Sequence, residues 1–273
     1  MEGAYKSQKK DGTIYYRSSI THNGIHISLG SFPNEIDATI AYKEARRIYQ
    51  DTNITTMNFR DYVKKLHWEK AICILNHRDH GIYVKTPIYQ GKEFVSYFLS
   101  PNTILKFDTD DFFYYSQHKI LSRNGGSYYV NDYGSQYRIL SRYGIRNYAV
   151  EGRDYDFVNG DPHDMRRANI QVYSHYHGVV CLVDSIPMVY EARIHLNGDY
   201  RIGYFESEEE AAVAYNKAVD YANDHGIHKD FPMDFVEEFT PREYAYIYRQ
   251  VKLPKRYRNG VKEMATSPNS LTK

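Results

Sequence analysis

The chain has 273 residues, enough for two or three small domains, and a net charge of +1. A near-neutral charge gives no overall basic signature, so any nucleic-acid surface must be local. No apolar run approaches the roughly 18 residues of a membrane span, and no apolar signal segment begins the chain, so we expect no membrane association. Its two cysteines, Cys73 and Cys181, make no disulfide framework and fit a reducing compartment.

The first sixty residues predict a small sheet covered by one helix. An Asn-Gly pair at 23–24 joins two alternating segments and favours a type I′ hairpin, because that turn needs positive φ at both central residues. A short strand, GAYK at 3–6, precedes the hairpin. Asn34 is expected to cap the following helix, in which alanines at helical spacing (ATIAYKEA, 38–45) let the helix lie close on the sheet.

Side chains alternate between the two faces of this predicted sheet. Tyr16, Ser18 and Ile20 are expected to face the helix. The outward residues include donors that suit DNA bases and phosphates. The expected outer face comprises Lys6, Gln8, Arg17, Ser19, Thr21, His26 and Ser28, with Lys9 and Lys10 near the DNA backbone.

The middle of the chain, 61–174, contains two groups of polar residues. CILNHRDH places Cys73, His77 and His80 at ligand-like intervals, but there is no fourth ligand in sight, so a zinc site is not predicted. The stretch DFVNGDPHDMRRANI, 156–170, combines a strand, an Asn-Gly-Asp turn and a predicted helix that ends in Asn169.

Residues 178–225 repeat the plan of the first sixty residues. GVVC at 178–181 matches GAYK, a second Asn-Gly pair stands at 197–198, and Ser207 is the expected helix cap. Glu191 replaces Arg17, and because a carboxylate repels phosphates we expect weaker DNA contact here and leave a protein-binding role open. The expected outer face of this copy comprises Cys181, Val183, Glu191, Arg193, His195 and Arg201.

The chain after residue 230 predicts one capped helix and a basic tail. Thr240 is the expected cap, Pro241 occupies the first helical position, and Glu243 closes a capping box. The following KLPKRYR, 252–258, is either a solvated segment or a phosphate clamp. Its cations are Lys252, Lys255, Arg256 and Arg258.

The 156–170 stretch resembles the core of the HNH endonucleases, in which a strand-borne Asp-His pair leads into an NGD turn and a helix carrying DNRxxN. The residues that match this motif are Asp156, Asn159, Gly160, Asp161, Asp164, Arg166 and Asn169. The resemblance extends to 105–130, which looks like the strand-rich lead-in of that class, and to RILSRYGI at 138–145, which falls where the family has a strand.

The two repeats resemble the plant APETALA2-type DNA-binding domain. The first carries YRSSI, LGSF and ATIAY, and the second carries YEARI, IGYF and AAVAY. The resemblances together imply an α+β fold with two small domains of three strands and a helix, at 1–60 and 175–230. These would flank a degenerate HNH core of the ββα type at 61–174, and a C-terminal helix and basic tail would occupy 231–273.

Three catalytic positions of the HNH motif are altered. Phe157 replaces the histidine that serves the family as base, Met165 replaces an asparagine, and Ser141 stands where the family has another histidine. Phosphodiester hydrolysis needs a base and a divalent metal, and Phe157 can accept no proton. Asp156 and Asn169 are therefore vestigial ligands. We expect no catalytic residue, no metal, no other cofactor and no nuclease activity.

The resemblance implies a sequence-specific protein of double-stranded DNA, descended from a homing endonuclease, and most naturally a transcriptional repressor of a phage or mobile element. We expect it in the cytoplasm of a bacterial host, at the nucleoid, with self-association left open. Further expected DNA contacts are Arg166, Arg167, Arg193, Arg201, Lys255, Arg256 and Arg258. Two alternatives stay open: an active endonuclease or nickase with His163 or His118 as base, and an inhibitor that competes with a related endonuclease for its target.

Overall fold

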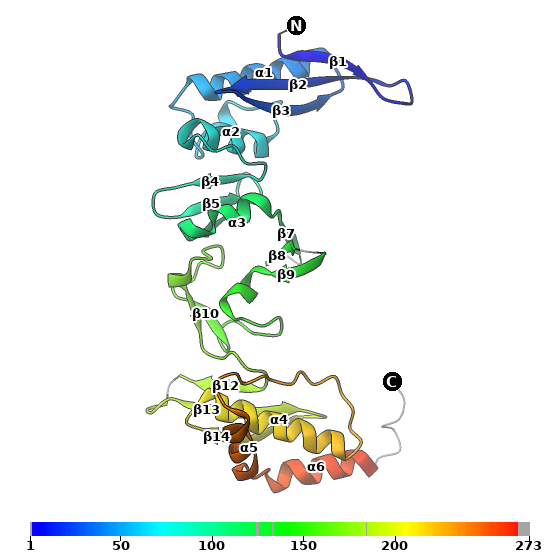
Figure 1. Ribbon diagram of the computed structural model, residues 1–273, viewed down its shortest axis with the longest axis vertical. Coiled ribbons are helices and arrows are strands. Elements are labelled where there is room, and N and C mark those ends of the chain that lie inside the picture. Colours follow the sequence, from blue (N-terminus) through cyan, green and yellow to red (C-terminus); the bar gives the residue numbers. More distant parts are fainter. Residues whose placement is uncertain (1, 124–125, 133, 184, 267–273) are drawn as a thin grey trace. The chain divides into compact units, whose positions relative to one another are not determined.

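The computed structural model describes residues 2–123, 126–132, 134–183 and 185–266. Within these ranges the chain is a mixed α+β protein built from small antiparallel sheets and six α-helices (Figure 1). The expected class, with several small three-stranded sheets, is confirmed. None of the described helices is long and apolar enough to cross a membrane.

The chain divides into two compact units, described separately below. The first contains Met1–Leu140 and Asn159–Asn169, and the second contains Ser141–Val158 and Ile170–Lys273. The finer division at residues 60, 174 and 230 stays a prediction.

The first unit begins with an antiparallel sheet of order β1-β2-β3, with helix α1 packed on one face (Figure 1). Asn23 and Gly24 have φ of 47° and 77°, which confirms the type I′ turn. The Asn34 side chain accepts from the backbone N–H of Asp37 at 2.8 Å, which confirms the helix cap. The elements are β1 (Ala4–Gln8), β2 (Ile14–His22), β3 (Ile25–Phe32) and α1 (Glu35–Gln50).

One apolar core joins this sheet to the next helix, α2 (Trp68–His80). It is made by Ile20, Ile27 and Leu29 of the sheet, the alanines of α1, and apolar residues of α2. The alternation that buries Ser18 and Ile20 and exposes Arg17 and Thr21 is the one expected from the sequence.

The rest of the first unit contains two more three-stranded sheets, with orders β4-β5-β6 and β7-β8-β9. The expected strand-rich lead-in at 105–130 also contains a short helix. The elements are β4 (Ile88–Gln90), β5 (Val95–Phe98), β6 (Ile104–Phe107), α3 (Phe112–Gln117), β7 (Ile120–Arg123), β8 (Ser127–Asp132) and β9 (Ser135–Arg138).

Two local expectations from the HNH resemblance are wrong. The expected strand at 138–145 is a 3-10 helix, Ile139–Tyr143, and the expected helix before Asn169 is a single 3-10 turn, Arg167–Asn169. For the turn at 167–169 the reason is that side chains bind the backbone and replace the helical hydrogen bonds. The Asn169 amide donates to the carbonyl of Asp164 at 2.8 Å, and its oxygen accepts from the N–H of Asn159 at 2.8 Å.

The second unit repeats the arrangement of the first sheet and α1, because α4 packs on a sheet of order β12-β13-β14 (Figure 1). The Ser207 side chain accepts from the N–H of Glu210 at 3.1 Å, and the Thr240–Glu243 capping box is present, so both predicted caps are confirmed. The elements are β10 (Tyr155–Phe157), β11 (Ile170–Val172), β12 (Val179–Leu182), β13 (Val189–His195), β14 (Asp199–Phe205), α4 (Glu208–Asp224), α5 (Pro241–Gln250) and α6 (Lys255–Thr266).

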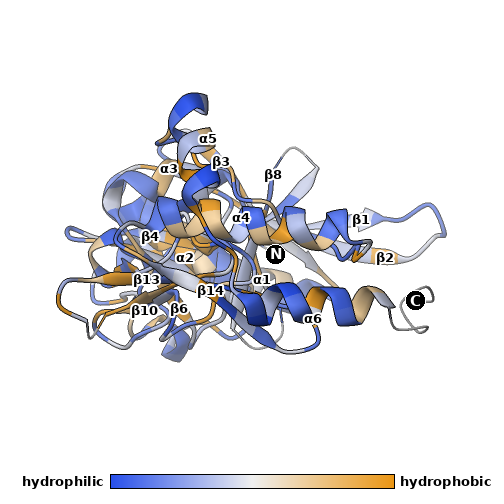
Figure 2. Cartoon of the chain, turned by 90° about the horizontal axis from the view of Figure 1, so that it is seen from below, coloured by the Kyte–Doolittle hydropathy of each residue, from blue (hydrophilic) through white to orange (hydrophobic). Residues whose placement is uncertain are grey.

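Two expectations for this unit are wrong. The Asn197-Gly198 turn is not of type I′: neither residue has positive φ, because His195 pairs with Asp199 and leaves a three-residue loop. The basic tail, as far as residue 266, is not a loose segment. Lys255, Arg256 and Arg258 lie in the first turn of α6, whereas Lys252 precedes this helix. The helix buries Tyr257 and Val261 in the core of this unit. Figure 2 shows hydrophobic and hydrophilic residues alternating along α6.

Candidate nucleic-acid interface

The strand register decides which side chains share the face of the first sheet that points away from α1. Directly opposed residues of an antiparallel pair lie on the same face. Arg17 is opposite Tyr5 on β1 and Ser31 on β3, and Thr21 is opposite His26. We define the outer face of the first sheet as Tyr5, Ser7, Tyr15, Arg17, Ser19, Thr21, His26, Ser28 and Ser31.

This outer face is polar, aromatic and free of carboxylates. The Arg17 guanidinium lies 5.6 Å from the ring centre of Tyr15, and Tyr5 beside it is 59% exposed. Thr21 Oγ1 and His26 Nδ1 are 3.3 Å apart. The expected positions of Arg17, Ser19, Thr21, His26 and Ser28 on this face are confirmed. Sequence reasoning missed Tyr5 and Tyr15.

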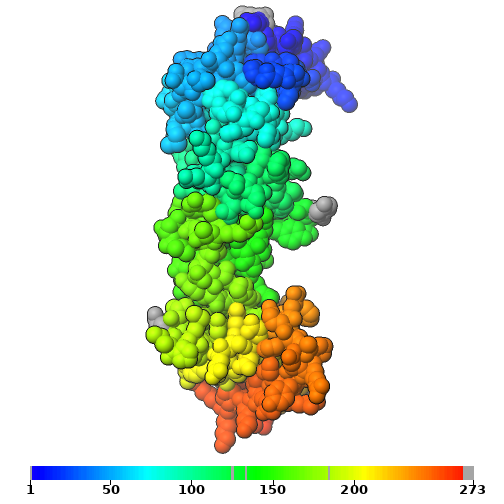
Figure 3. All heavy atoms as spheres, turned by 60° about the vertical axis from the view of Figure 1, so that its left-hand side comes forward, coloured from blue at the N-terminus to red at the C-terminus, as the bar shows by residue number. Residues whose placement is uncertain are grey.

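The expected positions of Lys6 and Gln8 are wrong. Lys6 is opposite Tyr16 and Gln8 is opposite Ile14, which places both on the face toward α1. They remain exposed, and the Gln8 amide donates to the Gly12 carbonyl at 3.0 Å. The β1–β2 hairpin tip, which carries exposed Lys9 and Lys10, projects from the surface in Figure 3.

The second sheet has the same strand order as the first, but its outer face has different electrostatics. Arg193 pairs with Glu191 at 3.3 Å, and His195 pairs with Asp199 at 2.8 Å. The Arg201 guanidinium stacks 4.9 Å from the ring centre of Tyr204. Carboxylates on the same face thus offset two of the cations, unlike on the first sheet.

One member of that expected face is misplaced. Cys181 is opposite Tyr190 on the helix side and is only 6% exposed, so the prediction that it points outward is wrong. The outward residues of β12 are Val180 and Leu182, which oppose Glu191 and Val189. Val183 is exposed but lies beyond the end of the strand.

The HNH-like residues hold their own loop together. Arg166 binds Asp164 through two hydrogen bonds of 2.8 and 2.6 Å, and Asp164 is fully buried. Burial alone would raise the pKa of Asp164, but the Arg166 guanidinium outweighs burial and lowers this pKa. Arg167 donates to Asp110 at 2.9 Å. Both arginines expected to contact DNA therefore have carboxylate partners within the protein.

Two of the three residues that differ from the HNH motif are buried in the protein. Phe157 on β10 and Met165 are buried at 5% and 2% exposure, and Ser141 is exposed. The alternative bases are also engaged: His118 stacks on Tyr114 with ring centres 4.2 Å apart, and His163 lies 3.4 Å from the Asp161 carboxylate.

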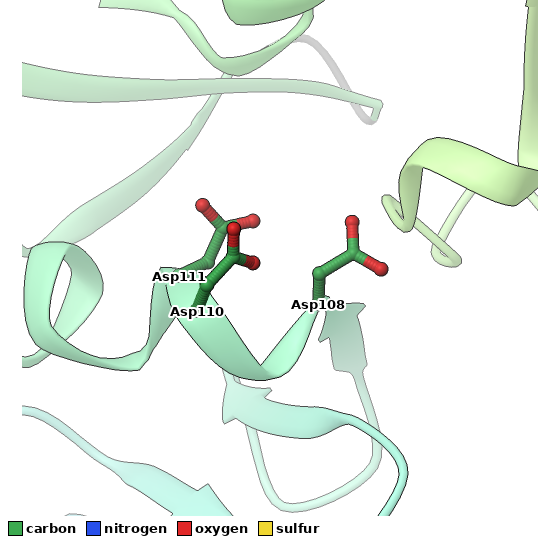
Figure 4. A group of neighbouring side chains, drawn as sticks. All are labelled: Asp108, Asp110 and Asp111. Carbon is green, nitrogen blue, oxygen red and sulfur yellow. The ribbon is translucent and has the colours of Figure 1, made fainter.

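Among the described residues, one group of three acidic side chains lies close enough together to hold a metal. Figure 4 shows its members, Asp108, Asp110 and Asp111, on one turn. Arg167 offsets their charge, since its N–H donates to Asp108 and its guanidinium to Asp110, both at 2.9 Å. We assign no metal site to this group.

The CILNHRDH segment has the character of a packed helix. Cys73 Sγ donates to the Thr86 carbonyl at 3.3 Å, and burial raises the pKa of Cys73 to about 12. His77 Nδ1 lies 2.7 Å from the Tyr49 hydroxyl. Both side chains thus have partners within the protein.

The cations at the start of α6 are exposed. Lys255, Arg256 and Arg258 surround the buried Tyr257, whose hydroxyl donates to the Ala218 carbonyl at 2.6 Å. The buried Tyr257 side chain fixes this basic turn to the second unit. The Arg256 guanidinium lies 5.9 Å from the ring centre of Tyr200.

Comparisons of the chain with known proteins found no match. No family model, no curated protein and no solved structure matches the chain.

Proposed function

We propose that this chain binds double-stranded DNA sequence-specifically through the outer face of its first sheet. The observation that carries the proposal is the local chemistry of that face. Arg17 stands among hydroxyl, imidazole and phenol groups, with no carboxylate among the residues of the face. An arginine held by a neighbouring ring can contact guanine through two hydrogen bonds, and hydroxyl groups can contact bases or phosphates.

We further propose that the protein has lost the ability to cut DNA and acts by occupying its site, most naturally as a transcriptional repressor. This part rests on Phe157 and Met165, which are buried apolar side chains at positions where the HNH motif has polar ones. A bound protein that cannot cleave can still block a promoter.

The test of the proposal is selection of bound duplexes from a random DNA library. We expect one motif to be enriched over successive rounds, and a promoter overlapping that motif to be silenced in cells that produce the protein. Recovery of the random library without enrichment would contradict sequence-specific binding.

We predict no metal-dependent cleavage of the selected site. Supercoiled plasmid carrying the site, incubated with the protein and Mg²⁺ or Mn²⁺, should stay as intact as plasmid without protein. Asp156→Ala is the control, because it removes a residue that an active HNH site would need. Nicking by the parent that disappears in Asp156→Ala would establish an active nuclease instead.

We predict that the basic turn of α6 contributes phosphate contacts. Affinity should fall steeply with salt as counterions are released, and Arg256→Ala with Arg258→Ala should reduce the slope of log K against log salt by about one to two units. The matched control is Arg242→Ala with Arg249→Ala, which removes the same charge from exposed positions of α5. Equal slopes for both double variants would show that α6 contacts no phosphate.

A further inference from the structure

The second unit contains a cavity that is separate from the outer face of the first sheet. Its volume is about 260 Å³, slightly below the usual range of small-ligand pockets, roughly 300–1,000 Å³. The lining residues come from 146–154, 174–180 and 193–199, together with Tyr215 of α4 and Phe231. All of them belong to the second unit.

Three residues that line this cavity each have a buried polar atom without a hydrogen-bond partner in the described part of the chain. These atoms are the hydroxyl of Tyr215, Nε of Arg193 and Nδ1 of His177. Tyr215 is only 1% exposed. Native proteins pair nearly all their buried polar groups with protein or ordered water, so three unpaired atoms on residues around one cavity indicate that a water or a ligand pairs them there.

The first repeat supplies an internal comparison. Tyr42 occupies the position of Tyr215, and each ring packs against a glycine, Gly3 or Gly178, that leaves no room for a Cβ atom. Packing therefore explains both rings. The Tyr42 hydroxyl, however, donates to the Glu2 carboxylate at 3.3 Å, whereas the Tyr215 hydroxyl is buried without a partner among the described residues.

All three unpaired atoms can donate hydrogen bonds. Arg193 is always a donor, a tyrosine hydroxyl can donate, and Nδ1 of a neutral histidine donates in one tautomer. Burial, with the charges of Arg146 and Arg153, lowers the pKa of His177 and favours that neutral form. Converging donors fit an oxyanion, such as a phosphate or a carboxylate.

The carboxylates near the cavity have partners, except that Oδ2 of Asp234 is buried without one among the described residues. Asp154 binds Arg153 at 2.6 Å, and Asp199 binds His195 at 2.8 Å. The fully buried Asp234 carboxylate accepts from the N–H of His177 at 2.9 Å and lies 3.5 Å from Arg146. Burial raises the pKa of Asp234 to about 6, which limits its repulsion of an incoming anion at lower pH.

Part of the cavity wall is aromatic. The ring of Tyr148 meets that of His177 edge to face, with centres 4.2 Å apart, and the Tyr215 ring lies 5.1 Å from His177. Rings in this arrangement suit a flat aromatic ligand. We propose that the cavity binds a small molecule that joins an oxyanion to an aromatic ring, and that Tyr215, Arg193 and His177 recognise the oxyanion.

The proposal does not depend on DNA binding, and its test uses the full chain without DNA. Phenyl phosphate is the probe, with inorganic phosphate and phenol as its separate halves, and binding is measured by calorimetry and by the shift in melting temperature. We expect phenyl phosphate to raise the melting temperature and to bind at least about tenfold more tightly than either half. Failure of phenyl phosphate to bind, or equal binding of inorganic phosphate, would overturn the proposal.

Two conservative variants separate a ligand contact from a structural role. Tyr215→Phe should weaken phenyl phosphate binding by about tenfold, the effect of losing one hydrogen bond to a charged group. The melting temperature of the unliganded variant should stay equal or rise, because the deleted hydroxyl has no partner in the protein. Tyr42→Phe is the matched control and should leave binding unchanged. Unchanged binding by Tyr215→Phe would contradict the assignment.

Discussion

Arg17→Ala should weaken binding to the selected DNA site by about 1–3 kcal/mol and relax the preference at one base pair, which is the effect of losing a two-bond contact to a base. Arg17 is exposed on the first sheet, steadied by the Tyr15 ring 5.6 Å away, and its face contains no carboxylate that would compete for the guanidinium. The measurement is the affinity of parent and variant for a panel of single-base variants of the site.

Arg193→Ala is the matched variant, because Arg193 occupies the corresponding sheet of the second repeat. Its guanidinium is partnered by Glu191 at 3.3 Å, and its buried Nε belongs to a residue that lines the cavity of the second unit. Its removal should therefore weaken all members of the panel alike and by less than Arg17→Ala. The opposite result, in which Arg193→Ala abolishes discrimination and Arg17→Ala preserves it, would assign base recognition to the second sheet.

The position of Arg17 on the outer face could be predicted from the sequence, because the turn between β2 and β3 fixes the register of these two strands. Asn23 and Gly24 form a two-residue turn, so β2 and β3 are aligned by the sequence itself, and alternation then separates Arg17 and Thr21 from Ser18 and Ile20. Burial confirms this separation residue by residue.

The register of β1 could not be predicted in the same way. A two-residue Asp11-Gly12 turn would have placed Lys6 opposite Arg17. Instead, Lys9 N–H donates to the Thr13 carbonyl at 2.9 Å, and Gly12 has φ of 86°, the geometry of a three-residue loop with a left-handed glycine. One extra loop residue shifts the pairing by one position, which moves Lys6 to the other face and brings Tyr5 beside Arg17.

The HNH-like loop shows a second limit. Its sequence predicts the Asn-Gly-Asp turn, and Gly160 has φ of 72° as such a turn requires. The sequence alone could not exclude a helix at the end of this loop. Whether Asn169 completes a helix or donates to the Asp164 carbonyl depends on the folded loop. The cavity of the second unit was equally hidden, since Tyr148, His177 and Tyr215 are far apart in the sequence.

The two repeats also differ at one position of the helix that packs on the sheet. The side chain at this position binds the backbone of a later segment of the chain. Glu44 of α1 is buried and accepts from the backbone N–H groups of Lys64, Lys65 and Leu66 at 2.8, 3.0 and 2.7 Å. The corresponding residue of α4 is Lys217, whose ammonium donates to the carbonyls of Tyr248 and Val251 at 2.5 and 2.7 Å. A negative side chain thus meets N–H groups ahead of α2, and a positive one meets carbonyls at the end of α5.

Glu44→Ala should therefore destabilise the first unit by about 3 kcal/mol, because each N–H group that loses a charged acceptor costs about 1–3 kcal/mol and water recovers part of the loss. Glu44→Gln keeps one acceptor oxygen and should cost less. Trp68, the only tryptophan, follows this segment directly, so its fluorescence during urea unfolding reports on the first unit.

Lys217→Met is the matched variant in the second unit, where it keeps most of the aliphatic side chain and removes only the ammonium. It should lower the urea midpoint followed by helical circular dichroism and leave the Trp68 midpoint unchanged. Reversing the charge should lower the urea midpoint more than removing it. Glu44→Lys turns an ammonium toward N–H groups, and Lys217→Glu turns a carboxylate toward carbonyls. A Trp68 midpoint that is unmoved by Glu44→Ala would show that the three N–H groups find water as readily as the carboxylate, and that this contact does not hold α1 to the segment before α2.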